Sequence, residues 1–128
     1  MKSNLFGYIK LGRLNKNIAD QIGRKPADIF IDYNDLLHIE QKRGSYLKSI
    51  NLNPLTYVKI IIDNYTEIRL GKNNALLLVA FIDANNYKNA AVIELKLISK
   101  YSMYVVKTAM PREKGMRANE VLLWKNKK

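Results

Sequence analysis

The fold is decided by the stretch ALLLVAFI, residues 75–82, in which all eight side chains are apolar. Turn-forming residues bound this stretch, GKNN at 71–74 before it and NN at 85–86 after it. A continuous apolar run of this length between turns is typical of a strand buried on both faces. It is far shorter than the roughly 20 residues that a membrane-spanning helix needs, and the N-terminus lacks the apolar core of a secretory signal. We therefore expect a soluble protein with this strand near the centre of a sheet.

Alternation of side chains with a period of two predicts three further strands, at residues 66–70, 90–98 and 102–109. In the strand over 90–98, one set of alternate positions is wholly apolar, whereas the other set includes Glu94 and Lys96. One face of the sheet should therefore contact helices, and the other should be open to a ligand.

The last of these strands carries polar side chains close to its end. Its alternation predicts Tyr104, Val106 and Thr108 on one side of the sheet and Lys107 on the other. Residues 112–128 form a basic C-terminal extension. Its apolar segment VLLW is open to three interpretations: an added strand or helix, a segment that binds a partner, or a partly disordered tail.

Helix signals precede most of the predicted strands. A cap at Asn15 begins a short helix, a cap at Asn34 or Asp35 begins a longer one, and Asn53-Pro54 begins a third. Short extended segments are expected at residues 6–11 and 27–31. This order predicts one α+β domain over residues 1–128, with N-terminal helices packed on a four-stranded, or slightly larger, antiparallel sheet.

Charge and composition narrow the functional classes. The chain has 22 Lys and Arg against 11 Asp and Glu, and the excess is concentrated in residues 96–128. Such a positive field suits a polyanion, most commonly nucleic acid, although it can also serve only to keep a protein soluble. The absence of cysteine excludes disulfides, thiolate nucleophiles and cysteine metal sites. With one histidine, we expect neither a metal site nor a cofactor.

His38 is the only histidine, and it lies in DLLHIEQKRG, residues 35–44. An unperturbed imidazole both takes and gives a proton near neutral pH, so acid–base chemistry would most naturally use it. On the predicted helix, His38 and Lys42 are four residues apart and share a polar face. The alternative interpretation is a polar surface histidine with no chemical role.

Three segments occur in a suggestive order: HIEQKRG at 38–44, Asn53-Pro54, and VVKT at 105–108. Together they resemble the phage-encoded branch of the barnase, EndoU, colicin and RelE-like nucleases, over roughly residues 8–111. The resemblance implies helices on a four-stranded antiparallel sheet and a metal-independent endoribonuclease that cuts RNA such as tRNA or mRNA. It also implies a toxin-like effector of a phage or mobile element, acting in the host bacterial cytoplasm or delivered from a phage particle. Such an effector needs an immunity or antitoxin protein as partner.

One position departs from the family pattern. A second histidine is expected near Arg43, but an arginine stays charged and cannot act as a base, although it can hold a phosphate. The chain therefore either uses a different second group or binds RNA without cutting it.

The resemblance and the chemistry of RNA cleavage together imply site residues. The ribose 2′-hydroxyl attacks the adjacent phosphorus, two protons move, and cations stabilise the charged phosphorane. His38 is the expected base or acid, with Glu94 as a rival base. The side chains expected to hold the phosphate or donate to it are Lys42, Arg43, Lys107 and Thr108. Those expected to contact RNA, by stacking, by supplying a proton or by charge, are Tyr104, Tyr101, Lys96 and Arg112.

Each of these residues also has a purely structural interpretation, because cations solvate helix faces and tyrosine and threonine favour strands. Three hypotheses therefore stand side by side. The protein is a ribonuclease, a nucleic-acid-binding module of the same fold without turnover, or a structural phage protein that contacts packaged genome.

Overall fold

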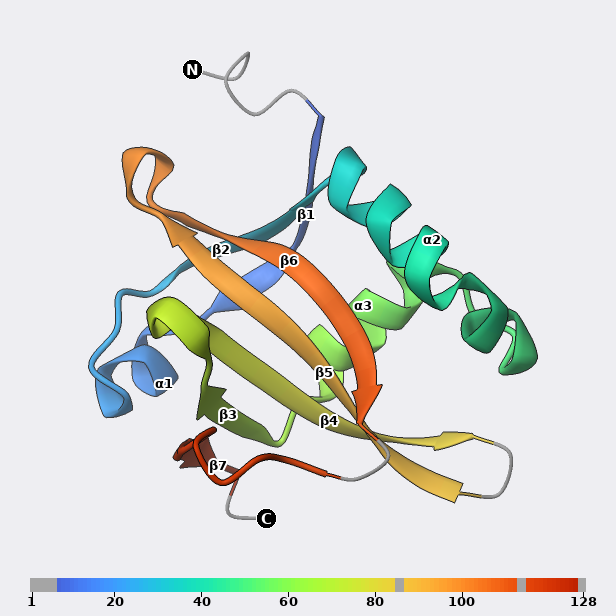
Figure 1. Cartoon of the computed structure of the whole chain (residues 1–128). Helices are drawn as coiled ribbons and strands as arrows, with labels where there is room; N and C mark the ends of the chain where they lie inside the picture. The colour runs from blue at the N-terminus through green and yellow to red at the C-terminus, as the bar shows by residue number, and fades with distance from the viewer. Residues whose placement is uncertain (1–6, 85–86, 113–114, 127–128) are drawn as a thin grey trace.

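Figure 1 shows the computed structural model, which describes residues 7–84, 87–112 and 115–126. Three α-helices and seven strands lie within these residues and form an α+β fold. The helices are α1 (Lys16–Gln21), α2 (Tyr33–Ser49) and α3 (Pro54–Asn64). The strands are β1 (Tyr8–Leu14), β2 (Ala27–Asp32), β3 (Glu67–Leu70), β4 (Leu76–Ala84), β5 (Tyr87–Ile98), β6 (Met103–Arg112) and β7 (Leu122–Lys125). Two short 3-10 turns are η2 (Lys72–Asn74) and η3 (Ser99–Tyr101).

The seven strands form one open sheet in the order β1-β2-β6-β5-β4-β3-β7. The apolar run at residues 75–82 forms most of β4, and Leu76 to Ala80 are all buried, as predicted. The prediction of a four-stranded, or slightly larger, antiparallel sheet is confirmed only in part, because the sheet has seven strands and is mixed. Strands β1 and β2 pair with each other and extend the sheet beyond β6, and β2 runs parallel to β6, so the sheet is mixed. The helices are consequently only partly interleaved with strands, because α1 lies between β1 and β2 whereas α2 directly precedes α3.

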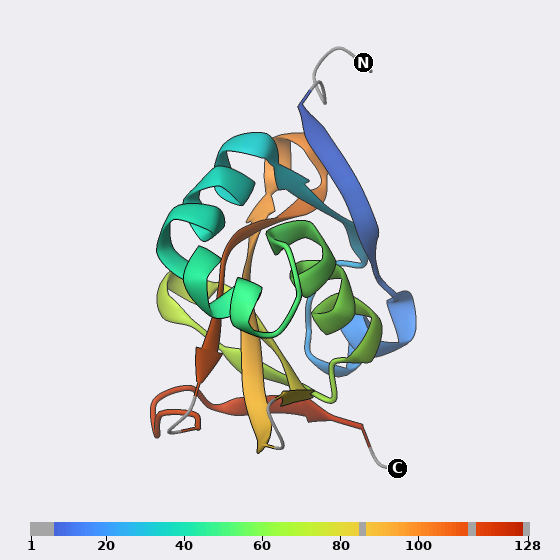
Figure 2. The same cartoon turned by 90° about the vertical axis from the view of Figure 1, so that its right-hand side faces the viewer.

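Helices α2 and α3 cover one face of the sheet, as Figure 2 shows from the side. Helix α3 begins as predicted, because the Asn53 side chain accepts a hydrogen bond of 2.8 Å from the Thr56 amide. Helix α2 begins earlier than predicted, because Asp32 is its cap and accepts from the Asn34 amide at 3.0 Å. The apolar stripes of the two helices bury Ile39 and Ile61, among others, against the sheet.

The other face of the sheet is less open than predicted. A second apolar cluster lies there around Leu77, Val79 and Val92, and Met116 of the C-terminal segment packs against it. The segment then continues into β7, which pairs with β3. Among the three interpretations of the extension, the added strand is therefore confirmed. No helix in the described part of the chain is long and apolar enough to cross a membrane.

Charged side chains fasten this C-terminal segment to the sheet. Arg112 and Glu120 form two hydrogen bonds of 2.9 and 2.7 Å, and Glu120 also accepts from the Arg117 amide at 2.7 Å. Arg69 donates to the Glu120 carbonyl oxygen at 3.0 Å. The hydrogen bond from Arg112 lowers the pKa of Glu120 to about 2. We call Arg69, Arg112, Arg117 and Glu120 the C-terminal clasp.

Candidate functional site

His38 lies on the solvent-exposed face of α2. In the described part of the chain its ring makes no hydrogen bond and no ion pair. Because Ile39 is the neighbouring buried position, the helix turns His38 away from the core. The imidazole is therefore accessible from solvent.

An ion pair brings β6 to the same part of α2. The Lys107 ammonium lies 3.3 Å from a carboxylate oxygen of Asp35, and Asp35 is three residues before His38. Residues three apart on a helix are neighbours, with about 5–6 Å between their Cβ atoms. Lys42 follows His38 by one turn and is exposed. We call Asp35, His38, Lys42 and Lys107 the α2–β6 surface.

A register shift in β6 explains why Lys107 reaches the helices. Leu95 pairs with Val106 but Glu94 pairs with Thr108, so Lys107 is an extra residue, a β-bulge. The bulge overturns the predicted alternation, in which Thr108 shared a side with Val106 and Lys107 pointed the other way. Lys107 instead joins the helix side, and Thr108 lies with Glu94 on the opposite face.

Arg43 does not share the exposed face of His38. Its guanidinium Nε is buried and has no partner among the described residues, and the same is true of the hydroxyl of Tyr57 in α3. The Tyr57 ring is fully buried and contacts Tyr46 edge-on, with 6.4 Å between ring centroids. Burial and the nearby Tyr46 raise the pKa of Tyr57, and the positive charge of Arg43 opposes that rise. Arg43 is therefore partly buried on the side of α2 that faces Tyr57 of α3.

The unpartnered Tyr57 hydroxyl gives a stability prediction. A buried polar group without a hydrogen bond costs about 1–3 kcal/mol. We expect Tyr57→Phe, which removes only that oxygen, to leave the free energy of unfolding unchanged or to raise it by about 1 kcal/mol. Urea denaturation of both proteins checks this. A clear loss of stability would contradict it and would reveal a partner for the hydroxyl.

The remaining predicted residues are spread over other parts of the sheet. Glu94 lines a small hollow of about 190 Å³ on the face opposite α2, together with Arg112, which is held by Glu120. Tyr101 lies in η3, where the Lys100 ammonium is 5.5 Å from the centre of its ring. These residues and Thr108 do not join the α2–β6 surface.

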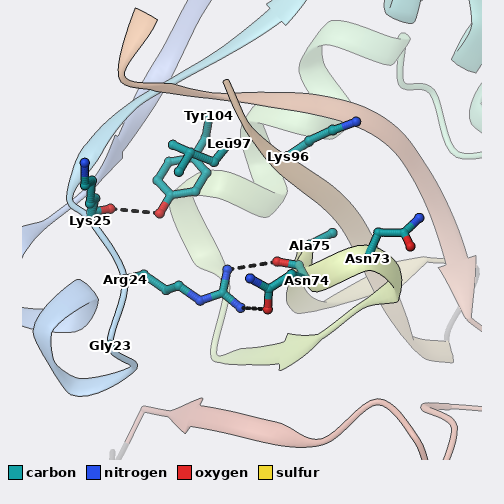
Figure 3. A pocket seen from close by; sticks show the side chains of 9 residues that line it. All are labelled: Gly23, Arg24, Lys25, Asn73, Asn74, Ala75, Lys96, Leu97 and Tyr104. Atoms are coloured by element: carbon teal, nitrogen blue, oxygen red, sulfur yellow. Dashed lines mark hydrogen bonds between the residues drawn. The ribbon is translucent and has the colours of Figure 1, made fainter. Parts of the chain in front are cut away.

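Lys96 and Tyr104 belong to a separate, strongly basic pocket of about 350 Å³ (Figure 3). It lies between the loop after α1, the η2 turn and the β5–β6 hairpin. We call it the basic pocket, and its polar lining residues are Arg24, Lys25, Asn73, Asn74, Lys96 and Tyr104.

Two hydrogen-bonded contacts shape the basic pocket. Arg24 spans its mouth and donates to the main-chain oxygen and side-chain oxygen of Asn74, both at 2.9 Å. The Tyr104 hydroxyl donates to the Lys25 carbonyl oxygen at 2.8 Å, and burial raises the pKa of Tyr104. Tyr104 therefore has a structural role in the pocket, where it ties the loop after α1 to β6.

Comparison with known proteins gives no relative. No family model matches this chain, and neither a curated protein nor a solved structure is significantly similar to it. Among the described residues, no group of three or more His, Asp and Glu side chains could hold a metal ion.

Sequence reasoning missed Asp35 as a site residue and missed most of the basic pocket. Arg24 and Asn74 are 50 residues apart, and only the folded chain brings them together. The local signal was present, because a basic pair follows Gly23 and an Asn pair lies in the turn before β4. These local residues do not predict that the loop after α1 contacts the turn before β4.

Proposed function

We propose that this protein is a metal-independent endoribonuclease that uses His38 as its acid–base group. The observation that carries the proposal is the contact between Lys107 and Asp35 beside an exposed His38. It assembles a proton-transfer group and a cation from two elements far apart in the sequence. The resemblance of HIEQKRG and VVKT to the phage-encoded nucleases agrees with this assignment.

In the proposed reaction, neutral His38 takes the proton of a ribose 2′-hydroxyl. The 2′-oxygen attacks the adjacent phosphorus, and the bond from phosphorus to the 5′-oxygen breaks. Lys107 and Lys42 stabilise the negative charge on the phosphorane oxygens. Water protonates the leaving 5′-oxygen, because the described α2–β6 surface offers no second imidazole. The products are a 2′,3′-cyclic phosphate and a 5′-hydroxyl.

The biological setting that we propose is the one that the resemblance implies. The protein acts as a toxin-like effector of a phage or mobile element in the bacterial cytoplasm, and an immunity protein restrains it. The α2–β6 surface is the natural target for such a partner, since covering it would exclude RNA. The proposed immunity partner is tested by measuring RNA cleavage after the purified protein is mixed with the product of a neighbouring gene.

A second candidate is a nucleic-acid-binding module without turnover. Two observations favour it: Arg43 stands where a second histidine is expected, and its Nε atom is buried near Tyr57 of α3. Incubation of RNA with the purified protein in EDTA separates the two functions, because only the enzyme produces new RNA ends. Binding without new ends would support the module.

Replacing the two members of the Lys107–Asp35 pair should change RNA affinity in opposite directions. Lys107→Gln removes a cation, so we expect RNA affinity and cleavage rate to fall about fivefold to tenfold at low salt. Asp35→Asn removes a repelling charge and releases Lys107, so RNA affinity should rise by a similar factor. Fluorescence anisotropy with labelled RNA measures both, and Lys59→Gln on α3 is the control for a distant charge. Equal effects of Lys107→Gln and Lys59→Gln would exclude Lys107 from the site.

A further inference from the structure

We propose that the basic pocket binds a phosphodiester of single-stranded nucleic acid, with the attached nucleoside against Leu97. The pocket is separate from the α2–β6 surface and would anchor the strand whose cleavage is proposed there. The inference rests on the proposed function only for the choice of RNA as the nucleic acid.

The charge of the pocket is the first argument. Arg24, Lys25 and Lys96 all line it, and none of its lining residues is acidic. No ion pair among the described residues includes any of these three cations. In contrast, Arg69 and Arg112 on the same sheet are each matched by a glutamate. The lining therefore has a positive charge that no acidic lining residue offsets, and it would attract an anion.

The fixed position of Arg24 is the second argument. Two of its N–H groups are held by neutral oxygens of Asn74, so the guanidinium is positioned while its charge stays uncompensated. A donor that is already ordered loses less conformational freedom when a ligand binds. Guanidinium groups also match the geometry of phosphate oxygens.

Size and lining indicate the class of ligand. A volume of about 350 Å³ lies near the lower end of the range for small-ligand sites, roughly 300–1,000 Å³. Leu97 is the partly exposed apolar side chain of the lining, Ala75 and Tyr104 are buried, and Asn73 adds an amide. Such a hollow suits one nucleotide unit with its phosphate, and it is too small for a duplex.

The place of the pocket on β6 links it to the proposed cleavage site. Tyr104 and Lys107 are three residues apart on β6, about 10 Å at 3.3 Å per residue. Tyr104 belongs to the core cluster under α2 and α3, and Lys107 pairs with α2. The basic pocket and the α2–β6 surface therefore share strand β6, and an RNA strand anchored in the pocket would follow β6 toward His38. Anchoring there would select which phosphate is presented for cleavage.

The test measures RNA binding in a His38→Ala background, so that cleavage does not interfere. The probe is a fluorescein-labelled oligouridylate of about eight nucleotides, a length that one small binding domain covers. The pocket variant is Lys25→Gln with Lys96→Gln, because neither side chain makes a hydrogen bond or ion pair among the described residues. The matched control, Lys48→Gln with Lys59→Gln, removes two exposed lysines from α2 and α3. Thermal melting confirms that all proteins are folded.

We expect the pocket variant to bind the probe about tenfold more weakly at low salt, and the control to change binding less than about twofold. The slope of log K against log salt should also become shallower by about 0.7 for each lost phosphate contact. Equal losses in the two double variants would overturn the proposal.

Uridine monophosphate and inorganic phosphate, titrated separately, distinguish a strand from a free anion. We expect the oligonucleotide to bind much more tightly than uridine monophosphate or phosphate. Equal affinities for all three would contradict a nucleic-acid strand as the ligand. If the pocket variant fails to weaken binding while the wild-type protein cuts RNA, only this inference falls. If the wild-type protein does not cut RNA but the pocket variant loses binding, the proposed ribonuclease function is wrong and the pocket proposal still holds.

Discussion

Replacing His38 by alanine should lower the rate of RNA cleavage by about 10²–10⁴-fold, the usual contribution of a positioned acid–base group. Affinity for RNA should stay within about twofold, since we propose that cations such as Lys107 and those of the basic pocket provide most of the binding. The side chain is exposed and makes no hydrogen bond or ion pair in the described part of the chain, so stability should not change. Gel-based cleavage rates and anisotropy measure the two effects separately.

Gln41→Ala is the matched control for His38. Gln41 lies on the same exposed face of α2, and its amide cannot transfer protons near neutral pH. Cleavage by this variant should stay close to that of the wild-type protein. If His38→Ala and Gln41→Ala reduce cleavage equally, His38 is not the acid–base group, and Glu94 becomes the candidate to replace next.

Replacing Glu120 by alanine should lower the free energy of unfolding by about 3–5 kcal/mol, as expected when one partner of a buried ion pair is removed. Arg112 would lose both of its charge-assisted hydrogen bonds inside a largely buried site, and the Arg117 amide would lose its acceptor. The C-terminal segment should then detach from the sheet and expose Leu77 and Val79. Urea denaturation measures the loss of stability, and Asp63→Ala, at an exposed position of α3, is the control. A cost below about 1 kcal/mol would show that the clasp contributes little.

The same ion pair predicts a dependence of stability on pH. The folded-state pKa of Glu120 is about 2, below its ordinary value of 4.5, because Arg112 stabilises the charged form. A lowered pKa contributes stability that is present above pH 4.5 and is lost as pH falls toward 2. The stability difference between the wild-type protein and Glu120→Gln should therefore shrink from pH 7 to pH 3. A difference that stays constant over this interval would contradict the assignment.

Much of the fold was predictable because its signals are local. Residues 75–80 of the apolar run are buried, whereas Phe81 is exposed, and Asn53-Pro54 starts a helix by a side-chain hydrogen bond. The parallel contact of β2 with β6 was not predictable, since alternation identifies strands but not their neighbours. The pairing of β7 with β3 was not predictable either, and the clasp beside it joins residues from three separate segments.

The candidate site was predictable only in part, for a related reason. The sequence identified His38 on a polar helical face, and the structure places it on an exposed face of α2. The bulge at Lys107 shifts the side chains after it by one position, so Thr108 and Lys107 exchanged sides relative to the prediction. No pattern of apolar residues marks such a bulge. The basic pocket likewise depends on a contact between two turns that lie far apart in the chain.

The most direct measurement is the chemistry of the ends that the wild-type protein leaves on RNA in the presence of EDTA. Mass spectrometry of a short RNA after incubation should find fragments ending in a 2′,3′-cyclic phosphate, paired with fragments that begin with a 5′-hydroxyl. His38→Ala, prepared in the same way, should leave the RNA whole. Intact RNA with the wild-type protein, under conditions where anisotropy shows it bound, would contradict the proposed enzyme. A 5′-phosphate on the products would instead exclude attack by the 2′-hydroxyl.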